Sequence, residues 1–99
     1  MIELPIACTL SAGEMAGRAG ELGAVLGRAA ERRGREDGLE LRFAAEPGIV
    51  PELARVIEQE RACCAFLRFR LTVEPAAGPI LLELTGPPGT REFLDSLLG

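Results

Sequence analysis

Leu67-Arg68-Phe69-Arg70-Leu71-Thr72-Val73-Glu74 alternates between apolar and polar side chains, and Leu39-Glu40-Leu41-Arg42-Phe43 does the same. Strict alternation predicts two β-strands that each bury one face and expose the other. Residues 80–85 form a third apolar strand candidate, joined to 67–74 by the loop at 75–79. The polar positions are expected to line a solvated face of mixed charge rather than an anion site, namely Glu40, Arg42, Arg68, Arg70, Thr72 and Glu83.

Helices are predicted next to these strands. Pro51 suits the first turn of a helix, and apolar residues follow it at helical spacing: Leu53, Val56, Ile57, Cys63 or Cys64, and Leu67. Gly86-Pro87-Pro88-Gly89 ends the last strand. Thr90 is then expected to cap a short terminal helix that buries Phe93, Leu94 and Leu97.

The amino-terminal third predicts one strand and one helix. Residues 4–10 form a short apolar run, and Ser11-Ala12-Gly13-Glu14 has the pattern of a capping box. An apolar stripe at helical spacing follows, and we expect this helix to fray near Arg32-Arg33-Gly34. Its glycines at positions 17, 20, 23 and 27 each weaken it by about 1 kcal/mol relative to alanine. Packing against the sheet, or against a second copy of the chain, must therefore stabilise it.

The predicted order of elements is β-α-β-α-β-β-α. This order, together with a sheet that exposes one face to solvent and packs the other against helices, indicates an α/β fold. We expect a two-layer sandwich, in which a four-stranded mixed sheet carries its helices on one face. A length of 99 residues fits a single domain, residues 1–99.

Composition excludes several classes of function. A net charge of -4 and only four Phe as aromatic residues argue against nucleic-acid binding. The absence of His excludes imidazole chemistry and imidazole metal ligands. The longest uncharged run, residues 4–13, is too short to span a membrane, and residues 1–3 do not begin a secretory signal. Three cysteines do not make a disulfide framework, so we expect a cytoplasmic protein with reduced thiols.

Glu60-Arg61-Ala62-Cys63-Cys64-Ala65-Phe66 is the segment whose residue types suggest chemistry. On a helix, the Glu60 carboxylate shares a face with both thiols. Cys8, on the first predicted strand, can supply a third sulfur from the covered side of the sheet. Thiolates prefer soft ions, so the candidate metal ligands are Cys8, Cys63, Cys64 and Glu60, and the candidate ions are Hg(II), trivalent arsenic and Zn(II).

Three other interpretations stay open. Cys8 and one of the adjacent pair can be small core residues, because cysteine is often fully buried. The chain can be an interaction module that dimerises without chemistry, for which Leu81 on the wet side of the last strand is an argument. A thiol enzyme, either redox-active or cleaving carbon–metal bonds, requires a reactive thiolate, which the dipole at a helix carboxyl terminus disfavours.

The motifs resemble those of a group of small bacterial proteins of about this length. The shared stretches are Ile6-Ala7-Cys8-Thr9-Leu10-Ser11, Glu60-x-x-Cys63-Cys64-x-Phe66 and Leu84-Thr85-Gly86-Pro87, so the resemblance covers nearly the whole chain. This group is associated with heavy-metal resistance, mercury especially, which implies Cys8, Cys63 and Cys64 as mercuric-ion ligands. Organomercurial lyases, which are much longer, use two thiols and a proton-donating carboxylate, and by that analogy Glu60 is the carboxylate.

Overall fold

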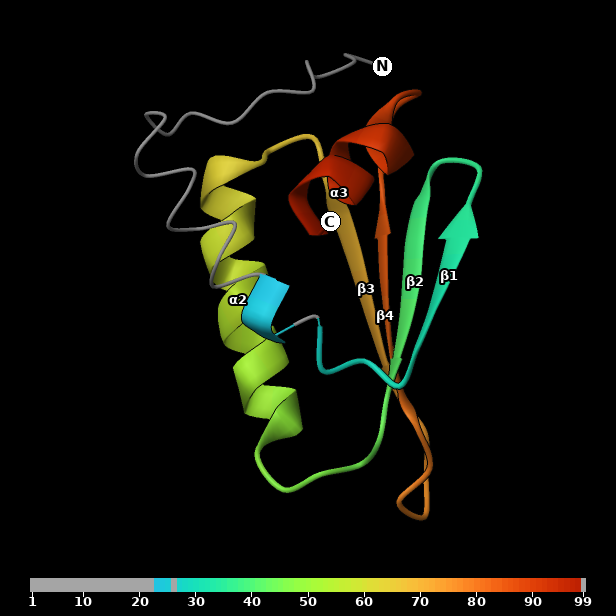
Figure 1. Ribbon diagram of the computed structural model, residues 1–99. Helices are drawn as coiled ribbons and strands as arrows, with labels where there is room; N and C mark the ends of the chain where they lie inside the picture. Colours follow the sequence, from blue (N-terminus) through green and yellow to red (C-terminus); the bar gives the residue numbers. More distant parts are fainter. Residues whose placement is uncertain (1–22, 26, 99) are drawn as a thin grey trace.

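The computed structural model describes residues 23–25 and 27–98 (Figure 1). Residues 23–25 are helical. The elements that follow are β1 (Glu31–Arg35), β2 (Gly38–Phe43), α2 (Ile49–Cys63), β3 (Arg68–Val73), β4 (Ile80–Thr85) and α3 (Thr90–Leu98). The strand expected at 4–10, the capping box and the first half of the expected first helix lie outside the described residues. No helix in these ranges is long and apolar enough to cross a membrane.

The four strands form one sheet in the order β1-β2-β4-β3, and all three neighbouring pairs are antiparallel. A sheet combined with helices is confirmed, and three of the four expected strands belong to it. A mixed sheet was expected, whereas the four described strands are all antiparallel, and the expected strand at 4–10 is not among them. β2 and β3 are both antiparallel to β4, so they run in the same direction, and α2 connects them. They are not neighbours, because β4 returns from β3 in a hairpin and pairs between them.

β1 is the main departure from the elements predicted by the sequence. Residues 31–35 form an edge strand, where we expected the frayed end of a helix. Arg35 pairs with Gly38 across the turn at 36–37, so β1 and β2 make a hairpin. This pairing satisfies the backbone groups along one side of β2, which outweighs the lack of apolar residues in β1. Gly38 is required here, since a Cβ at this position would collide with the backbone carbonyl of Leu84.

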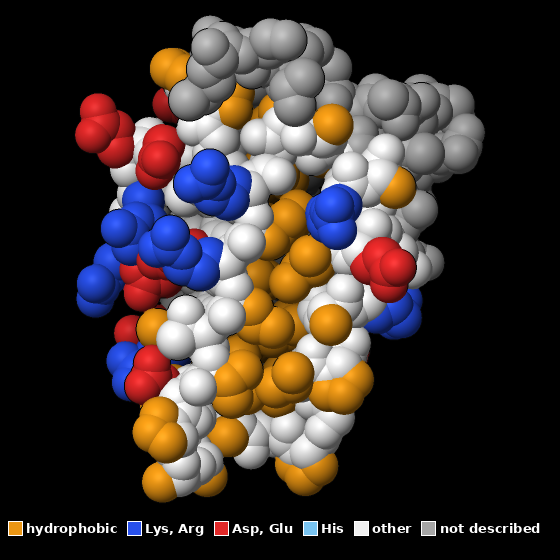
Figure 2. Space-filling model, turned by 180° about the vertical axis from the view of Figure 1, so that it is seen from behind, with side chains coloured by type: hydrophobic (Ala, Val, Ile, Leu, Met, Phe, Trp, Pro, Cys, Tyr) orange, Lys and Arg blue, Asp and Glu red, His pale blue; other side chains and the backbone are white. Residues whose placement is uncertain are grey.

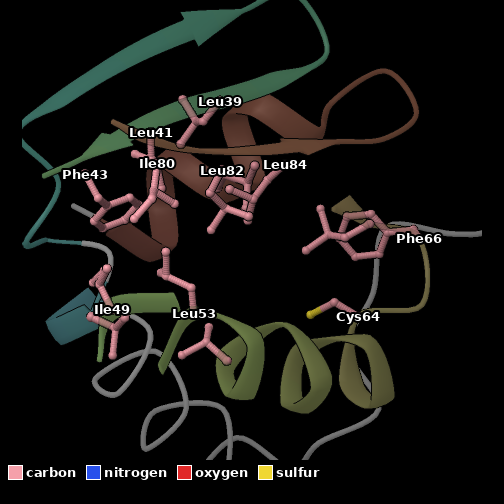
Figure 3. Packing of buried hydrophobic residues seen from close by; sticks show 14 residues of the cluster. Leu39, Leu41, Phe43, Ile49, Leu53, Cys64, Phe66, Ile80, Leu82 and Leu84 are labelled. Atoms are coloured by element: carbon pink, nitrogen blue, oxygen red, sulfur yellow. The ribbon is translucent and has the colours of Figure 1, made fainter. Parts of the chain in front are cut away.

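One face of the sheet carries the apolar core. The register aligns three rows across β2, β4 and β3: Leu39, Leu84 and Phe69; Leu41, Leu82 and Leu71; Phe43, Ile80 and Val73. The six β2 and β4 members of these rows are at most 3% exposed. Figure 3 shows these side chains pointing toward Ile49 and Leu53 of α2. The alternation seen in the sequence therefore sorts core from solvent as predicted.

Both helices contribute to the same core. Leu53 and Val56 of α2 and Leu94 of α3 are buried with the sheet residues. At the start of α3, the Thr90 hydroxyl is fully buried and donates to the Pro87 carbonyl oxygen at 2.6 Å. The first turn of α2 is tied to the preceding segment by Arg28. Its guanidinium donates to Glu52 at 2.7 Å and to Glu46 at 3.1 Å, and these two carboxylates raise the pKa of Arg28.

The opposite face of the sheet is polar and solvated, as the alternation predicted. Arg35 lies between Glu40 at 2.7 Å and Glu83 at 3.3 Å, and Arg70 reaches Glu83 at 3.7 Å. These ion pairs are exposed and contribute little to stability. Leu81 is half-buried on this face, where it pairs with Arg42 of β2.

Neighbouring leucines on β4 test which face forms the core. Leu82→Ala removes a side chain that is 0% exposed in the central row, so it should lower the free energy of unfolding by about 2–5 kcal/mol. Leu81→Ala, the matched control on the solvated face, should lower it by less than about 1 kcal/mol. Urea denaturation followed by circular dichroism measures both. Equal losses in the two variants would contradict the assignment of the faces.

Candidate functional site

The carboxyl end of α2 carries the residues that the sequence analysis singled out. α2 ends at Cys63, and the backbone N–H of Cys64 still donates to the Glu60 carbonyl oxygen at 2.6 Å. The Leu67 N–H then donates to the Cys64 carbonyl oxygen at 3.1 Å, which turns the chain toward β3. Cys64 is therefore held at the junction between a helix and a strand by backbone hydrogen bonds on both sides.

Glu60 and Cys64 are buried together. Glu60 is 4% exposed and Cys64 is 2% exposed, and the Cys64 thiol lies 3.9 Å from Glu60 Oε2, within the range of a sulfur hydrogen bond. Glu60 is one of two polar residues buried in the described chain, the other being Thr90. Burial of a carboxyl group is unfavourable unless hydrogen bonds satisfy it. In the described chain, every buried side-chain oxygen or nitrogen has such a partner.

Aromatic and apolar residues enclose this pair on the side of the core. Figure 3 shows the Cys64 sulfur pointing into the space between α2 and the sheet. Phe66 is 6% exposed and packs edge-to-face on Phe93 of α3, with ring centroids 5.1 Å apart and planes at 81°. Arg61, Ala62 and Ala65 are exposed, so solvent lies within a few residues of the thiol.

The predicted site is brought together only in part. Glu60 and Cys64 are adjacent, as the helical spacing predicted. Cys63 is the last residue of α2, but its side chain is not described, and Cys8 lies outside the described residues. Within the described part of the chain, no group of three Cys, His, Asp or Glu residues is arranged to hold a metal ion. The convergence of the three sulfurs therefore stays a prediction.

The contact between Phe66 and Phe93 is not predictable from the sequence. Both phenylalanines stand in segments that the sequence had marked, the cysteine motif and the last helix. Their contact depends on how α3 returns across the sheet, and no local pattern encodes this. Both positions are apolar, so the sequence predicts that they are buried. It does not predict which residues they contact.

The polar face of the sheet offers two shallow hollows with mixed linings. One has a volume of about 220 Å³ and is lined by Arg35, Asp37, Arg68, Arg70, Glu83 and Thr85. Another, of about 500 Å³, combines apolar residues with five charged ones, namely Glu31, Arg33, Glu40, Arg42 and Glu74. Each hollow carries acidic side chains beside its arginines, and Arg35 in the smaller hollow is paired with both Glu40 and Glu83. The buried Glu60–Cys64 pair is therefore the stronger candidate site.

Thiol alkylation tests the burial of Cys64. Because its side chain is 2% exposed, iodoacetamide should label Cys64 at least about tenfold more slowly in the native chain than in the urea-unfolded chain. Peptide mass spectrometry after timed quenching measures the rate at each cysteine. The unfolded chain is the control for intrinsic reactivity. Equal rates in the two states would contradict burial, and faster labelling of the native chain would favour a reactive-thiol enzyme.

Comparison of the chain with protein-family models, curated proteins and solved structures finds no match. The resemblance to small bacterial proteins with adjacent cysteines stays a prediction.

Proposed function

We propose that this protein binds a soft metal or metalloid ion in the cytoplasm, with Hg(II), trivalent arsenic and Zn(II) as the candidate ions. Cys63 and Cys64 are the proposed ligands, Cys8 is the proposed third sulfur, and Glu60 is the neighbouring carboxylate. For the whole chain we propose a two-layer α/β sandwich with its helices on one face of the sheet. In this arrangement the end of α2 can face residues from the amino-terminal segment.

The burial of Glu60 beside Cys64 carries the proposal. A helix that only had to cover the sheet would place an apolar residue at position 60, since Leu53 and Val56 occupy comparable buried positions on α2. A glutamate there is unfavourable for packing, and its carboxyl oxygen lies 3.9 Å from a thiol. A chemical role for this pair explains why an acidic group stands among core residues.

Metal binding gives the carboxylate such a role. A thiol must lose its proton to ligate a metal ion, so binding releases protons. Glu60 Oε2 is placed to accept the Cys64 proton as the sulfur–metal bond forms. Thiolate ligands favour soft ions over Mg²⁺ or Ca²⁺. A four-coordinate zinc site would use Glu60 itself as the fourth ligand, because the chain has three cysteines and no His.

Titration of the reduced protein with Hg(II), Zn(II) and arsenite, followed by thiolate–metal absorbance in the ultraviolet, tests this proposal. We expect stoichiometric binding of at least one of these ions, and its loss in Cys63→Ser/Cys64→Ser. Cys8→Ser reports whether a third sulfur takes part, and Glu60→Gln should weaken binding by about tenfold or more. Glu58→Gln, an exposed glutamate on the same helix, is the matched control and should bind as the unmodified protein does.

Two results would count against metal binding. Absence of stoichiometric binding by all three ions would favour an interaction module without chemistry. Binding that persists unchanged in the double serine variant would place the ion elsewhere. Circular dichroism of each variant confirms that a loss of binding is not a loss of fold.

A further inference from the structure

The two edges of the sheet differ in chemistry. β1 carries charged residues at four of its five positions, and all five are exposed. Arg32 pairs with the core residue Leu41, so a charge stands on the apolar side of this edge. Charged edges and inward-pointing charges prevent pairing with other chains. β3, at the other edge, carries Phe69, Leu71 and Val73 on the apolar side, and its two charged residues, Arg68 and Arg70, lie on the solvated side.

The outer side of β3 has hydrogen-bonding groups available for a further strand. Glu74 donates its N–H to the Pro79 carbonyl oxygen across the hairpin. Backbone groups alternate in direction along an antiparallel strand, so those of Arg68, Arg70 and Thr72 also face β4. The N–H and C=O groups of Phe69, Leu71 and Val73 then face away from the sheet. Among the described residues, no strand pairs with this side.

Apolar surface continues from this edge into the molecule. Phe69 and Leu71 are only partly buried, and so are Val50 and Ile57 on α2. Val73 is 57% exposed, more than any other large apolar side chain whose exposure the structure describes. Figure 2 shows, on the back of the molecule, an apolar strip that runs lengthwise between charged borders. This edge therefore offers both backbone groups and apolar area to a partner.

The sequence of β3 is complementary to itself in one antiparallel register. A two-fold axis at Leu71 places Leu71 opposite Leu71 of the second copy, and Phe69 opposite Val73. The same register places Arg68 opposite Glu74 twice, on the solvated face. Registers centred on Phe69 or Arg70 instead place arginines opposite one another, which is unfavourable.

We propose that two copies of this chain pair through β3, centred on Leu71, to form a continuous eight-stranded antiparallel sheet. The groups facing outward on Phe69, Leu71 and Val73 would form about six backbone hydrogen bonds, two for each directly opposed pair. The apolar strips of the two copies join across the axis. Because the strands run antiparallel, the two Cys63–Cys64 segments lie at opposite ends of the interface, so dimerisation does not depend on metal binding.

Charge reversal tests this dimer. Sedimentation velocity over a concentration series should show a monomer–dimer equilibrium for the unmodified chain. Arg68→Glu and Glu74→Arg each put like charges opposite one another at two places, so each should raise the dimer dissociation constant by about tenfold. The double variant Arg68→Glu/Glu74→Arg restores opposite charges and should restore dimerisation. Arg55→Glu and Glu58→Arg, both exposed on α2, change the net charge equally and should have little effect.

Hydrogen exchange supplies a second measurement on the unmodified chain. The amides of Phe69, Leu71 and Val73 should exchange more slowly as protein concentration rises. A monomer at all concentrations, or a dimer unaffected by both charge reversals, would overturn the proposal. Slow exchange of these three amides in a monomer would also overturn it, since another segment of the same chain would then cover the edge.

Discussion

The pairing of β4 between β2 and β3 is the interaction on which the rest of the described structure depends. β4 is hydrogen-bonded along both sides, and its inward side chains Ile80, Leu82 and Leu84 occupy the middle of every core row. Since β4 separates β2 from β3, the connection between those two strands must cross over the sheet. That connection contains α2, and the crossing lays its apolar stripe on the apolar face of the sheet.

This arrangement also determines where the candidate site lies. α2 must end close to the start of β3, and the turn that joins them begins at Cys64. Glu60 lies one helical turn before Cys64 on α2, and it is buried because this part of α2 packs against the sheet. A buried carboxyl group beside a thiol is stable only where hydrogen bonds replace water. The chemistry proposed for the pair follows from this forced burial of an acidic residue.

The edges of the sheet show a second consequence of the strand order. β1 has no large apolar side chain and belongs to the sheet because its backbone pairs with β2. Its charged side chains therefore lie at one edge of the sheet. β3 has an apolar face, but as the other edge strand it can bury that face only in part. An apolar edge strand is a surface that proteins usually cover. The self-complementary order of charges over residues 68–74 supports the proposal that a second copy covers β3.

From the sequence alone, strands were predictable at 39–43, 67–74 and 80–85, together with the face that each buries, and helices were predictable after Pro51 and after Thr90. Each of these elements has apolar residues at the spacing of a strand or of a helix, and this spacing predicts the type of element directly. It also placed Glu60 and Cys64 on one helical face. Only the tertiary structure decided that β4 lies between β2 and β3, that residues 31–35 are a strand, and that Phe66 meets Phe93. Those outcomes depend on backbone pairing and packing between segments distant in the chain, and no local pattern records them.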